Sequence, residues 1–264
     1  MQKNETEKLR SVLIEVLDEF VHICEENNLT YFLTAGTLLG AVRHKGFIPW
    51  DDDIDVAMPR KDYELFLDLF DKTERKDLYL LSQRKQTNKI IFFKRFAKLC
   101  KAGTVYAEKN KDNCSGIFID IFPFDNTLLF LAPFQTKVIR FFWNLYHTKA
   151  NFIEPKKKWK YIAKSILFFF LPEKLLSKIS KKLFVIFNKH QTKYISFFSG
   201  KYGSKKETHS RDNIFPLSKV LFEEKYYFAP CNCHSFLHTL YGNYMQIPSF
   251  ANRHTHHEYI IFEE

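Results

Sequence analysis

Four aspartates lie within the short stretch 51–55 of this chain. So much negative charge in one place is unfavourable unless a cation neutralises it. Side chains two residues apart on a β-strand point to the same side, so Asp53 and Asp55 can face one cation together. Carboxylate oxygens suit Mg²⁺ or Mn²⁺. A solvated acidic turn is the alternative interpretation, but the apolar neighbours Trp50 and Ile54 favour a metal site.

Groups that suit a phosphate precede these aspartates. Gly36 and Thr37 follow a short apolar run, where a turn can offer its backbone N–H groups to an anion. Arg43 and Lys45 add positive charge a few residues later. A phosphate-binding turn combined with paired carboxylates is what group transfer at a diphosphate requires. The stretch therefore predicts a metal-dependent transferase with a nucleotide-activated donor.

The pattern of apolar residues predicts alternating helices and strands around this stretch. Apolar side chains recur at helical spacing from Leu9 to Cys24, which predicts an amphipathic helix over residues 5–28. The paired aspartates come at the start of a run typical of a buried strand, residues 54–58. The other predicted elements are strands at 31–34, 90–99 and 117–122, helices at 38–43 and 61–70, and a loop at 45–50.

Residues 128–200 differ in composition from the rest of the chain. Phe, Leu and Ile alternate there with Lys in helical patterns, which predicts a helical insertion within a single domain spanning residues 1–264. The run 156–160 holds four lysines between two of the predicted helices. Amphipathic helices of this kind bind anionic membrane surfaces. The alternative is that the apolar stripes pack on the core and the lysines only keep the protein soluble.

The composition is that of a basic globular protein. Its 40 Lys and Arg against 30 Asp and Glu give a formal net charge of +10, which favours anionic partners. No RNA-binding signature accompanies that charge, so we expect no nucleic acid partner. Five cysteines without a disulfide pattern indicate a reducing compartment. With a polar start and no apolar run longer than 166–171, the sequence predicts a cytoplasmic protein, peripheral at the inner face of the bacterial membrane if the insertion binds lipid.

Residues 31–58 resemble the signature of the LicD family, which includes the bacterial phosphocholine transferases and, as distant relatives, fukutin and fukutin-related protein. The stretch from Gly36 to Asp55 carries the most specific part of this resemblance. Weaker likeness extends through residues 94–104, 116–125, 222–230 and 241–245. The resemblance therefore covers most of the chain outside the helical insertion.

The resemblance implies a mixed α/β (α+β) core of the nucleotidyltransferase type, like that of the polymerase-beta superfamily. That superfamily places a Gly-Ser or Gly-Thr turn before an Asp-x-Asp strand, and a third acid on a neighbouring strand. The third acid here is implied to be Asp120, between Ile119 and Ile121. The expected catalytic and metal-binding residues are Asp53, Asp55 and Asp120, and the expected phosphate-binding residues are Gly36, Thr37, Arg43 and Lys45.

The reaction implied by the resemblance is transfer of phosphocholine, or a similar phospho-alcohol, from a CDP-linked donor. The acceptor would be a hydroxyl of a cell-surface glycan of the lipopolysaccharide, teichoic acid or capsule type, built on a lipid. Trp50 or another aromatic residue would contact a quaternary ammonium group. Two alternatives remain: a glycosyltransferase that uses a metal-bound nucleotide sugar, and a non-catalytic basic membrane-surface protein.

Two further segments have more than one interpretation. The basic stretch 94–98 is either a solvated sheet edge or a source of positive charge for phosphate. At the C-terminus, the segment 253–257 could form a zinc site with the Cys and His residues of 231–238, although Cys-x-Cys is not a standard zinc spacing. The family resemblance favours a segment that closes over the phosphate or the acceptor.

Overall fold

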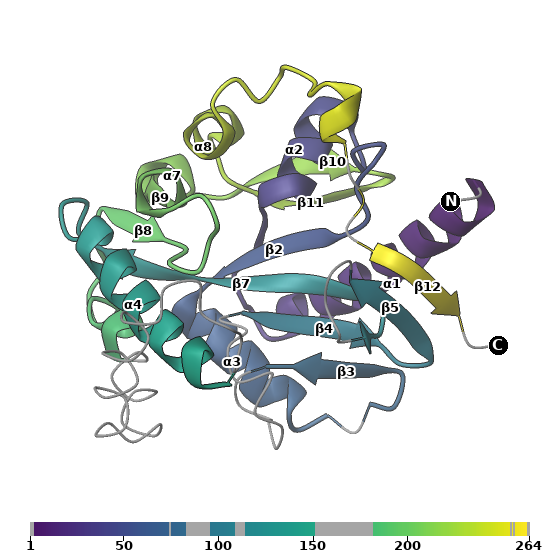
Figure 1. Cartoon of the computed structure of the whole chain (residues 1–264), viewed down its shortest axis with the longest axis horizontal. Helices are drawn as coiled ribbons and strands as arrows, with labels where there is room; N and C mark the ends of the chain where they lie inside the picture. The colour runs from purple at the N-terminus through teal and green to yellow at the C-terminus, as the bar shows by residue number, and fades with distance from the viewer. Residues whose placement is uncertain are drawn as a thin grey trace.

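A curled, mixed β-sheet of seven strands forms the centre of the computed structural model, which describes residues 3–73, 75–82, 96–108, 114–150, 182–253, 255 and 257–262 (Figure 1). Its order is β1-β2-β7-β4-β3, and β8 and β9 extend it from β7. The strands are β1 (Phe32–Leu33), β2 (Ile54–Pro59), β3 (Leu78–Leu81), β4 (Ala97–Lys101), β5 (Thr104–Glu108), β6 (Cys114–Ser115), β7 (Phe118–Thr127), β8 (Tyr194–Ser196), β9 (Thr208–Ser210), β10 (Ser218–Phe222), β11 (Lys225–Ala229) and β12 (His257–Phe262). The helices are α1 (Lys3–Glu26), α2 (Ala35–His44), α3 (Arg60–Phe70), α4 (Ala132–Ala150), α7 (Ser204–Glu207), α8 (Cys233–Tyr241) and the 3-10 turns η1 (Arg211–Asn213) and η2 (Phe250–Asn252).

The central strands β2 and β7 run parallel and bring two carboxylates together. In their register Asp55 lies opposite Asp120, and Ala57 lies opposite Phe122. On the other side of β7, antiparallel β4 places Lys98 opposite Asp120. Paired residues of neighbouring strands point to the same face, so these charged side chains share one face of the sheet. The neighbouring residues of both strands are buried, as expected for strands covered on both faces.

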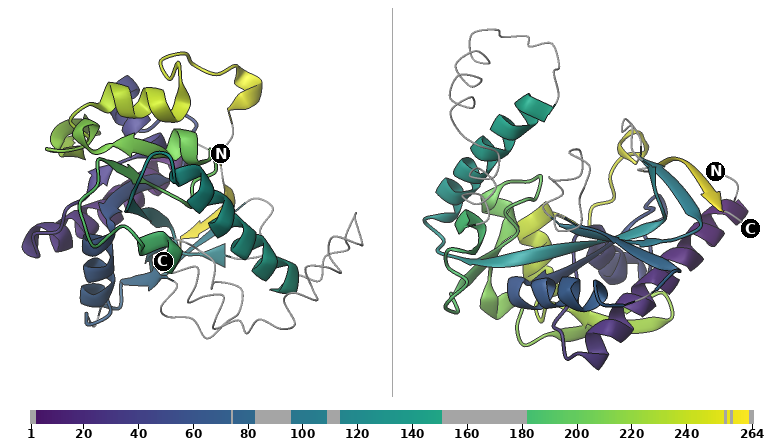
Figure 2. Two further views of the ribbon diagram at one scale, coloured as in Figure 1. Left: turned by 90° about the vertical axis from the view of Figure 1, so that its left-hand side faces the viewer. Right: turned by 90° about the horizontal axis from the view of Figure 1, so that it is seen from below.

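Helices α1 and α3 both pack against the other face of the sheet (Figure 2), α1 on β4 and β7 and α3 on β2 and β7. Phe20 of α1 and Phe66 of α3 meet with ring centroids 5.1 Å apart. The residues of α1 that recur at helical spacing are fully buried: Leu9, Leu13, Val16, Leu17 and Phe20. Burying one such side chain stabilises the fold by about 1.5–3 kcal/mol. The amphipathic helix predicted at the N-terminus therefore closes the core.

Helices α2 and α8 lie on the face that bears the carboxylates (Figure 1). Helix α2 packs against β2, against the β10–β11 hairpin and against α8. The short helix α7 contacts both α8 and α4. These elements leave a hollow above the middle of the sheet, where the carboxylates lie.

A small second sheet brings the C-terminal strand β12 close to the N-terminal helix α1. Strand β12 pairs with β5, and β5 pairs with β6, all antiparallel. Phe262 of β12 reaches α1, where Lys8 Nζ lies 4.3 Å from its ring centroid. Figure 1 accordingly shows the two chain ends on the same side.

The structure confirms the mixed α/β class and the predicted elements around the aspartates. The strand predicted at 90–99 is described only from residue 97 on, as part of β4. The nucleotidyltransferase type of the core and the domain bounds stay predictions.

The predicted insertion is described only in part. It begins with helix α4, which projects from the end of β7 (Figure 2), and it ends with β8, which pairs with β7 before residue 200. The run 156–160 lies outside the described residues. Among the described helices, none combines the length and the apolar character that a membrane span requires.

A buried ion pair fixes α3 to the end of β7, and its loss should destabilise the fold. Asp125 is 0% exposed and accepts hydrogen bonds from Arg60 Nε at 2.8 Å and Nη2 at 2.7 Å. Asp125→Asn keeps the shape but removes the buried counter-ion of Arg60 and leaves only the partly exposed Glu64 at 3.3 Å. Breaking such a pair costs about 3–5 kcal/mol, which a lower urea midpoint of unfolding would reveal.

Asp77→Asn is the matched control. Asp77 pairs with Arg75 at the surface, with side-chain exposures of 46% and 28%, and exposed pairs contribute about 1 kcal/mol or less. An equal decrease in the urea midpoint for the two variants would show that the buried pair of Arg60 and Asp125 stabilises the fold no more than a surface pair.

Candidate functional site

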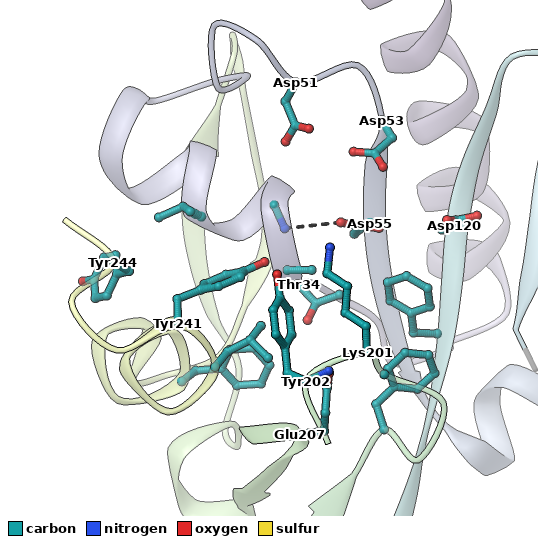
Figure 3. A pocket seen from close by; sticks show the side chains of 18 of the residues that line it. Thr34, Asp51, Asp53, Asp55, Asp120, Lys201, Tyr202, Glu207, Tyr241 and Tyr244 are labelled. Atoms are coloured by element: carbon teal, nitrogen blue, oxygen red, sulfur yellow. Dashed lines mark hydrogen bonds between the residues drawn. The ribbon is translucent and has the colours of Figure 1, made fainter. Parts of the chain in front are cut away.

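A pocket of about 610 Å³ opens on the face of the sheet that bears the carboxylates. Asp51, Asp53, Asp55 and Asp120 all line it. In Figure 3 these four aspartates gather at one side, while Tyr202 and Glu207 lie at the other. The structure therefore brings together the three aspartates predicted as catalytic and adds Asp51 to them.

The start of α2 holds Asp55 in place. Gly36 N donates to Asp55 Oδ2 at 3.2 Å, and Asp55 N donates to Thr37 Oγ1 at 2.7 Å. A Cβ atom at residue 36 would lie only 2.8 Å from Asp51 Oδ2, so the glycine is what allows the carboxylates to approach this backbone. Gly36 thus lines the pocket at a helix N-terminus, which favours anions. Thr37 is buried and acts through the backbone of Asp55.

The carboxylates of the pocket repel one another. The pKa of Asp53 lies well above its usual range, first because the carboxyl is buried and then because of the negative charges of Asp55, Asp51 and Asp120. A nearby cation would reverse this shift. The oxygen-only donors fit a hard divalent cation such as Mg²⁺.

Lys98 is the buried counter-ion of Asp120. Its side chain is almost fully buried, and Nζ lies 3.3 Å from Asp120 Oδ1 and 3.0 Å from the ring centroid of Phe118. Asp120 Oδ1 itself accepts no hydrogen bond from the described residues. Of the two interpretations of the stretch 94–98, the solvated edge is therefore wrong for Lys98, while Lys94 and Arg95 lie outside the described residues.

The predicted phosphate-binding cations occupy different places. Arg43 lines the pocket, and its Nη1 donates to Tyr244 O at 2.8 Å, which ties α2 to the segment after α8. Lys45 lies at the C-terminal end of α2 with a left-handed φ of 63°, outside the set of residues that line the pocket. Trp50 lines the pocket, but Arg253 Cζ already lies 4.6 Å from its ring centroid.

A buried cluster anchors the aspartate stretch to the C-terminal strand. Asp52 Oδ2 accepts hydrogen bonds from the hydroxyl of Tyr106 at 3.2 Å and from the backbone N–H of His257 at 3.1 Å. The Nδ1 atom of His257 also contacts this oxygen. All three side chains are buried. These three residues do not line the pocket, so His257 restrains the aspartate stretch from outside it, whereas Arg253 contacts the pocket residue Trp50.

The structure gives the other Cys and His residues separate partners. His234 Nδ1 lies 3.0 Å from the hydroxyl of Tyr244, Cys233 Sγ contacts Pro230 O at 3.1 Å, and Cys231 is exposed. In the part of the chain that the structure describes, no three His, Cys, Asp or Glu side chains already converge as a metal-ligand group. The zinc hypothesis gains no support, and a cation at the aspartates rests on their donor chemistry.

Several residues of the pocket carried no signal in the sequence. Lys201, Tyr202 and Glu207 come from the region between β8 and β9, within or beside a segment predicted as helical insertion. Tyr241 falls in a segment of family likeness, but nothing in its sequence indicated a role. Their participation depends on β8 pairing with β7, which the local sequence does not reveal.

Comparison with known proteins now adds to this geometry. A family model described as "LicD/FKTN/FKRP, nucleotidyltransferase domain" matches residues 28–170, more than half of the chain. The chain belongs to the LicD family. The matched range contains the four pocket aspartates, Gly36 and Arg43.

One relative extends the likeness to nearly the whole chain, and two others match parts of it. The chain is 30% identical to the lipopolysaccharide cholinephosphotransferase LicD of Haemophilus influenzae over 270 aligned positions, covering 97% of each protein. An uncharacterised protein of Rickettsia prowazekii is 33% identical over 38% of this chain and 35% of its own length. Another, of Rickettsia typhi, is 40% identical over 22% of this chain and 18% of its own length.

Removing the partner of Asp52 should loosen the aspartate stretch. In His257→Phe the ring is retained, but a buried carboxylate loses one of its contacts, at an expected cost of about 1–3 kcal/mol. Hydrogen–deuterium exchange should become faster at residues 50–53 and stay unchanged in the middle of β7.

His22→Phe provides the control, because His22 pairs with Glu26 at the surface with side-chain exposures of 61% and 60%. Its unfolding free energy should change by about 0.5 kcal/mol or less. Wild-type exchange at residues 50–53 in His257→Phe would refute the anchoring role.

Proposed function

We propose that this protein transfers phosphocholine, or a similar phospho-alcohol, from a CDP-linked donor to a hydroxyl of a cell-surface glycan. The observation that carries the proposal is the match over 97% of the chain to a protein named as a lipopolysaccharide cholinephosphotransferase, with the carboxylate pocket inside the matched range. The pocket supports it independently, because its volume lies within the range of about 300–1,000 Å³ usual for small-molecule sites.

The transfer step needs a new phosphorus–oxygen bond and the loss of an old one. The oxygen of the acceptor hydroxyl bonds to the phosphorus that carries choline, and the bond from that phosphorus to the bridging oxygen breaks. CMP leaves with the electron pair, and the hydroxyl proton passes to a carboxylate of the site. In this scheme Asp120 receives the proton, and Arg43 stabilises the charge on CMP.

Asp53 and Asp55, with Asp120, would hold Mg²⁺ or Mn²⁺ against the diphosphate. Such a cation, when bound, neutralises charge on the phosphates and on the departing CMP. The raised pKa of Asp53, the buried Oδ1 of Asp120 and the close approach of the Asp51 and Asp55 carboxylates to Gly36 all suit a bound cation. A donor panel separates this function from a glycosyltransferase: CMP release from CDP-choline supports it, whereas UDP release from UDP-sugars contradicts it.

Asp53→Asn and Asp55→Asn should each abolish transfer, because each removes a charged oxygen ligand but little packing. Asp53→Asn should also unfold at the same or a higher temperature, since it relieves repulsion from the neighbouring carboxylates. Mg²⁺ should raise the unfolding temperature of the wild type but not of these variants. Chelation should stop wild-type turnover, and Mg²⁺ or Mn²⁺ should restore it.

Asp68→Asn, on α3, is the control for removal of an aspartate elsewhere. Wild-type turnover in either pocket variant, or an equal Mg²⁺-induced stabilisation in all proteins, would contradict the metal assignment.

We also propose that the start of the insertion binds an anionic membrane, where a lipid-linked acceptor would lie. Helix α4 turns Gln135, Thr136 and Ile139 inward, while Phe134 is 64% exposed and Phe130, just before the helix, is 77% exposed. Exposed aromatic residues on a chain of net charge +10 are complementary to an anionic lipid surface. The exposure of Phe130 and Phe134 thus favours membrane contact over the alternative, in which every apolar side chain of the insertion packs on the core.

Vesicle co-sedimentation tests this surface. Binding should require anionic lipid, weaken with salt, and fall in Phe130→Ser/Phe134→Ser and when the lysines of 156–160 become Gln, since each Lys contributes about 1 kcal/mol. Tyr226→Ser, which changes a residue 67% exposed on the distant β10–β11 hairpin, should bind like the wild type. Equal recovery in the supernatant with and without anionic vesicles would exclude the membrane role.

A further inference from the structure

The pocket has a second end, away from the aspartates, that is almost entirely aromatic. The rings that line it come from β7, the β8–α7 region and α8: Phe122, Phe124, Phe197, Tyr202, Phe236 and Tyr241. Tyr202 and Tyr241 meet edge to face with centroids 5.6 Å apart, and Phe122 and Phe197 lie 4.6 Å apart. Such a wall presents many π faces and few hydrogen-bond donors to a ligand.

One carboxylate, Glu207, lies in this aromatic end. It is only 6% exposed, and its Oε1 accepts the backbone N–H of Tyr202 at 3.1 Å. Gly200 packs so closely on it that a Cβ there would lie 2.0 Å from Glu207 Oε1, so the carboxyl has little freedom to turn away. Burial raises the pKa of Glu207 to about 7, although the Tyr202 N–H and the charges of Lys201 and Arg140 oppose the shift.

Tyr241 lies between the two ends of the pocket. Its pKa is raised first by burial, and then by Tyr202 and by the charges of Asp55, Asp51 and Glu207. Tyr241, the aspartates and Glu207 all line the same pocket, so one ligand in that pocket can contact both groups of carboxylates. Figure 3 agrees, with Tyr202 and Glu207 on one side of the pocket and the aspartates on the other.

Cations already collect at this aromatic end. Lys201 Nζ lies 5.1 Å and Lys206 Nζ 5.8 Å from the ring centroid of Tyr202. In Figure 3 the amino end of Lys201 points towards the aspartates, where a phosphate of the ligand would draw it. A cation of the ligand would then take the place of Lys201 beside the Tyr202 ring, while Lys206 stays 5.8 Å from its centroid.

We propose that Glu207, Tyr202 and Tyr241 form a subsite for the quaternary ammonium group of the donor. This inference rests on the proposed function and specifies the donor alcohol. A quaternary ammonium has no N–H to donate, so it is recognised by aromatic faces and a negative charge rather than by hydrogen bonds. The subsite is a different place in the same pocket from the contact expected at Trp50.

The test compares two donors that differ only in charge: CDP-choline and its carbon isostere CDP-3,3-dimethylbutanol. Calorimetry with Mg²⁺ and without acceptor measures binding alone. The wild type should bind CDP-choline about tenfold more tightly. Glu207→Gln and Tyr202→Leu should each reduce that preference to about threefold or less, while affinity for the neutral isostere stays within about twofold.

Glu223→Gln is a matched control. Like Glu207, Glu223 accepts a backbone N–H, that of Phe47 at 2.9 Å, and packs against a glycine, Gly46, but it does not line the pocket. The Glu223→Gln variant should prefer CDP-choline to the neutral isostere as strongly as the wild type does. A thermal melt checks each variant, and Tyr202→Leu decides the question if Glu207→Gln does not fold.

The outcomes separate this inference from the proposed function. Equal wild-type affinity for the two donors, or an equal loss for both in Glu207→Gln, would overturn the subsite and assign Glu207 a structural role. Preference for CDP-choline without transfer to any glycan would retain the subsite and overturn the proposed reaction. If neither nucleotide binds, the subsite and the proposed reaction are both refuted.

Discussion

Mutual repulsion among carboxylates is the constraint on which the site depends. Parallel pairing of β2 with β7 sets Asp55 beside Asp120, and the turn into β2 adds Asp51 and Asp53. Like charges brought together on one face of a sheet would separate if the backbone allowed it. Much of the surrounding structure therefore restrains that backbone, through the start of α2 on one side and a buried lysine, Lys98, on the other.

The two ends of the pocket differ in chemistry: one is lined by aspartates and the other by aromatic rings and one glutamate. At the aspartate end, the ligand must bring or share a cation to be accepted. At the aromatic end, a cation on the ligand itself is what the single carboxylate and the tyrosines can recognise. Under the proposed function, a zwitterionic phospho-alcohol would satisfy both requirements in one orientation only, with its phosphate at the aspartate end.

Local patterns of sequence predicted the parts of the fold that have local causes. The helical spacing of α1 and the alternation that pairs Asp53 with Asp55 are properties of a few adjacent residues. Asp120 was reached only through family resemblance, because nothing nearby shows that β7 would lie parallel to β2. The role of Glu207 could not be predicted at all, because its position depends on β8 pairing with β7 after more than sixty intervening residues.

The same limit applies to single side chains. The sequence left open whether Lys98 is exposed, and it is buried because β4 pairs with β7 in a register that sets it against Asp120. Lys45 follows Arg43 by two residues, but it lies where α2 ends and is not among the residues that line the pocket. Proximity in sequence to a motif is a poor guide where a helix ends, because the chain changes direction there.

The anchor between Asp52 and His257 joins residues that are 205 positions apart. A ribosome that adds about 5–20 residues per second therefore synthesises them roughly 10–40 s apart. During that interval the acidic stretch exists without its buried partner, and β5 lacks the strand that covers its edge. A nascent or truncated chain thus contains the whole aspartate motif but not its final geometry. Synthesis of β12, rather than synthesis of the motif, sets the moment at which the site can form.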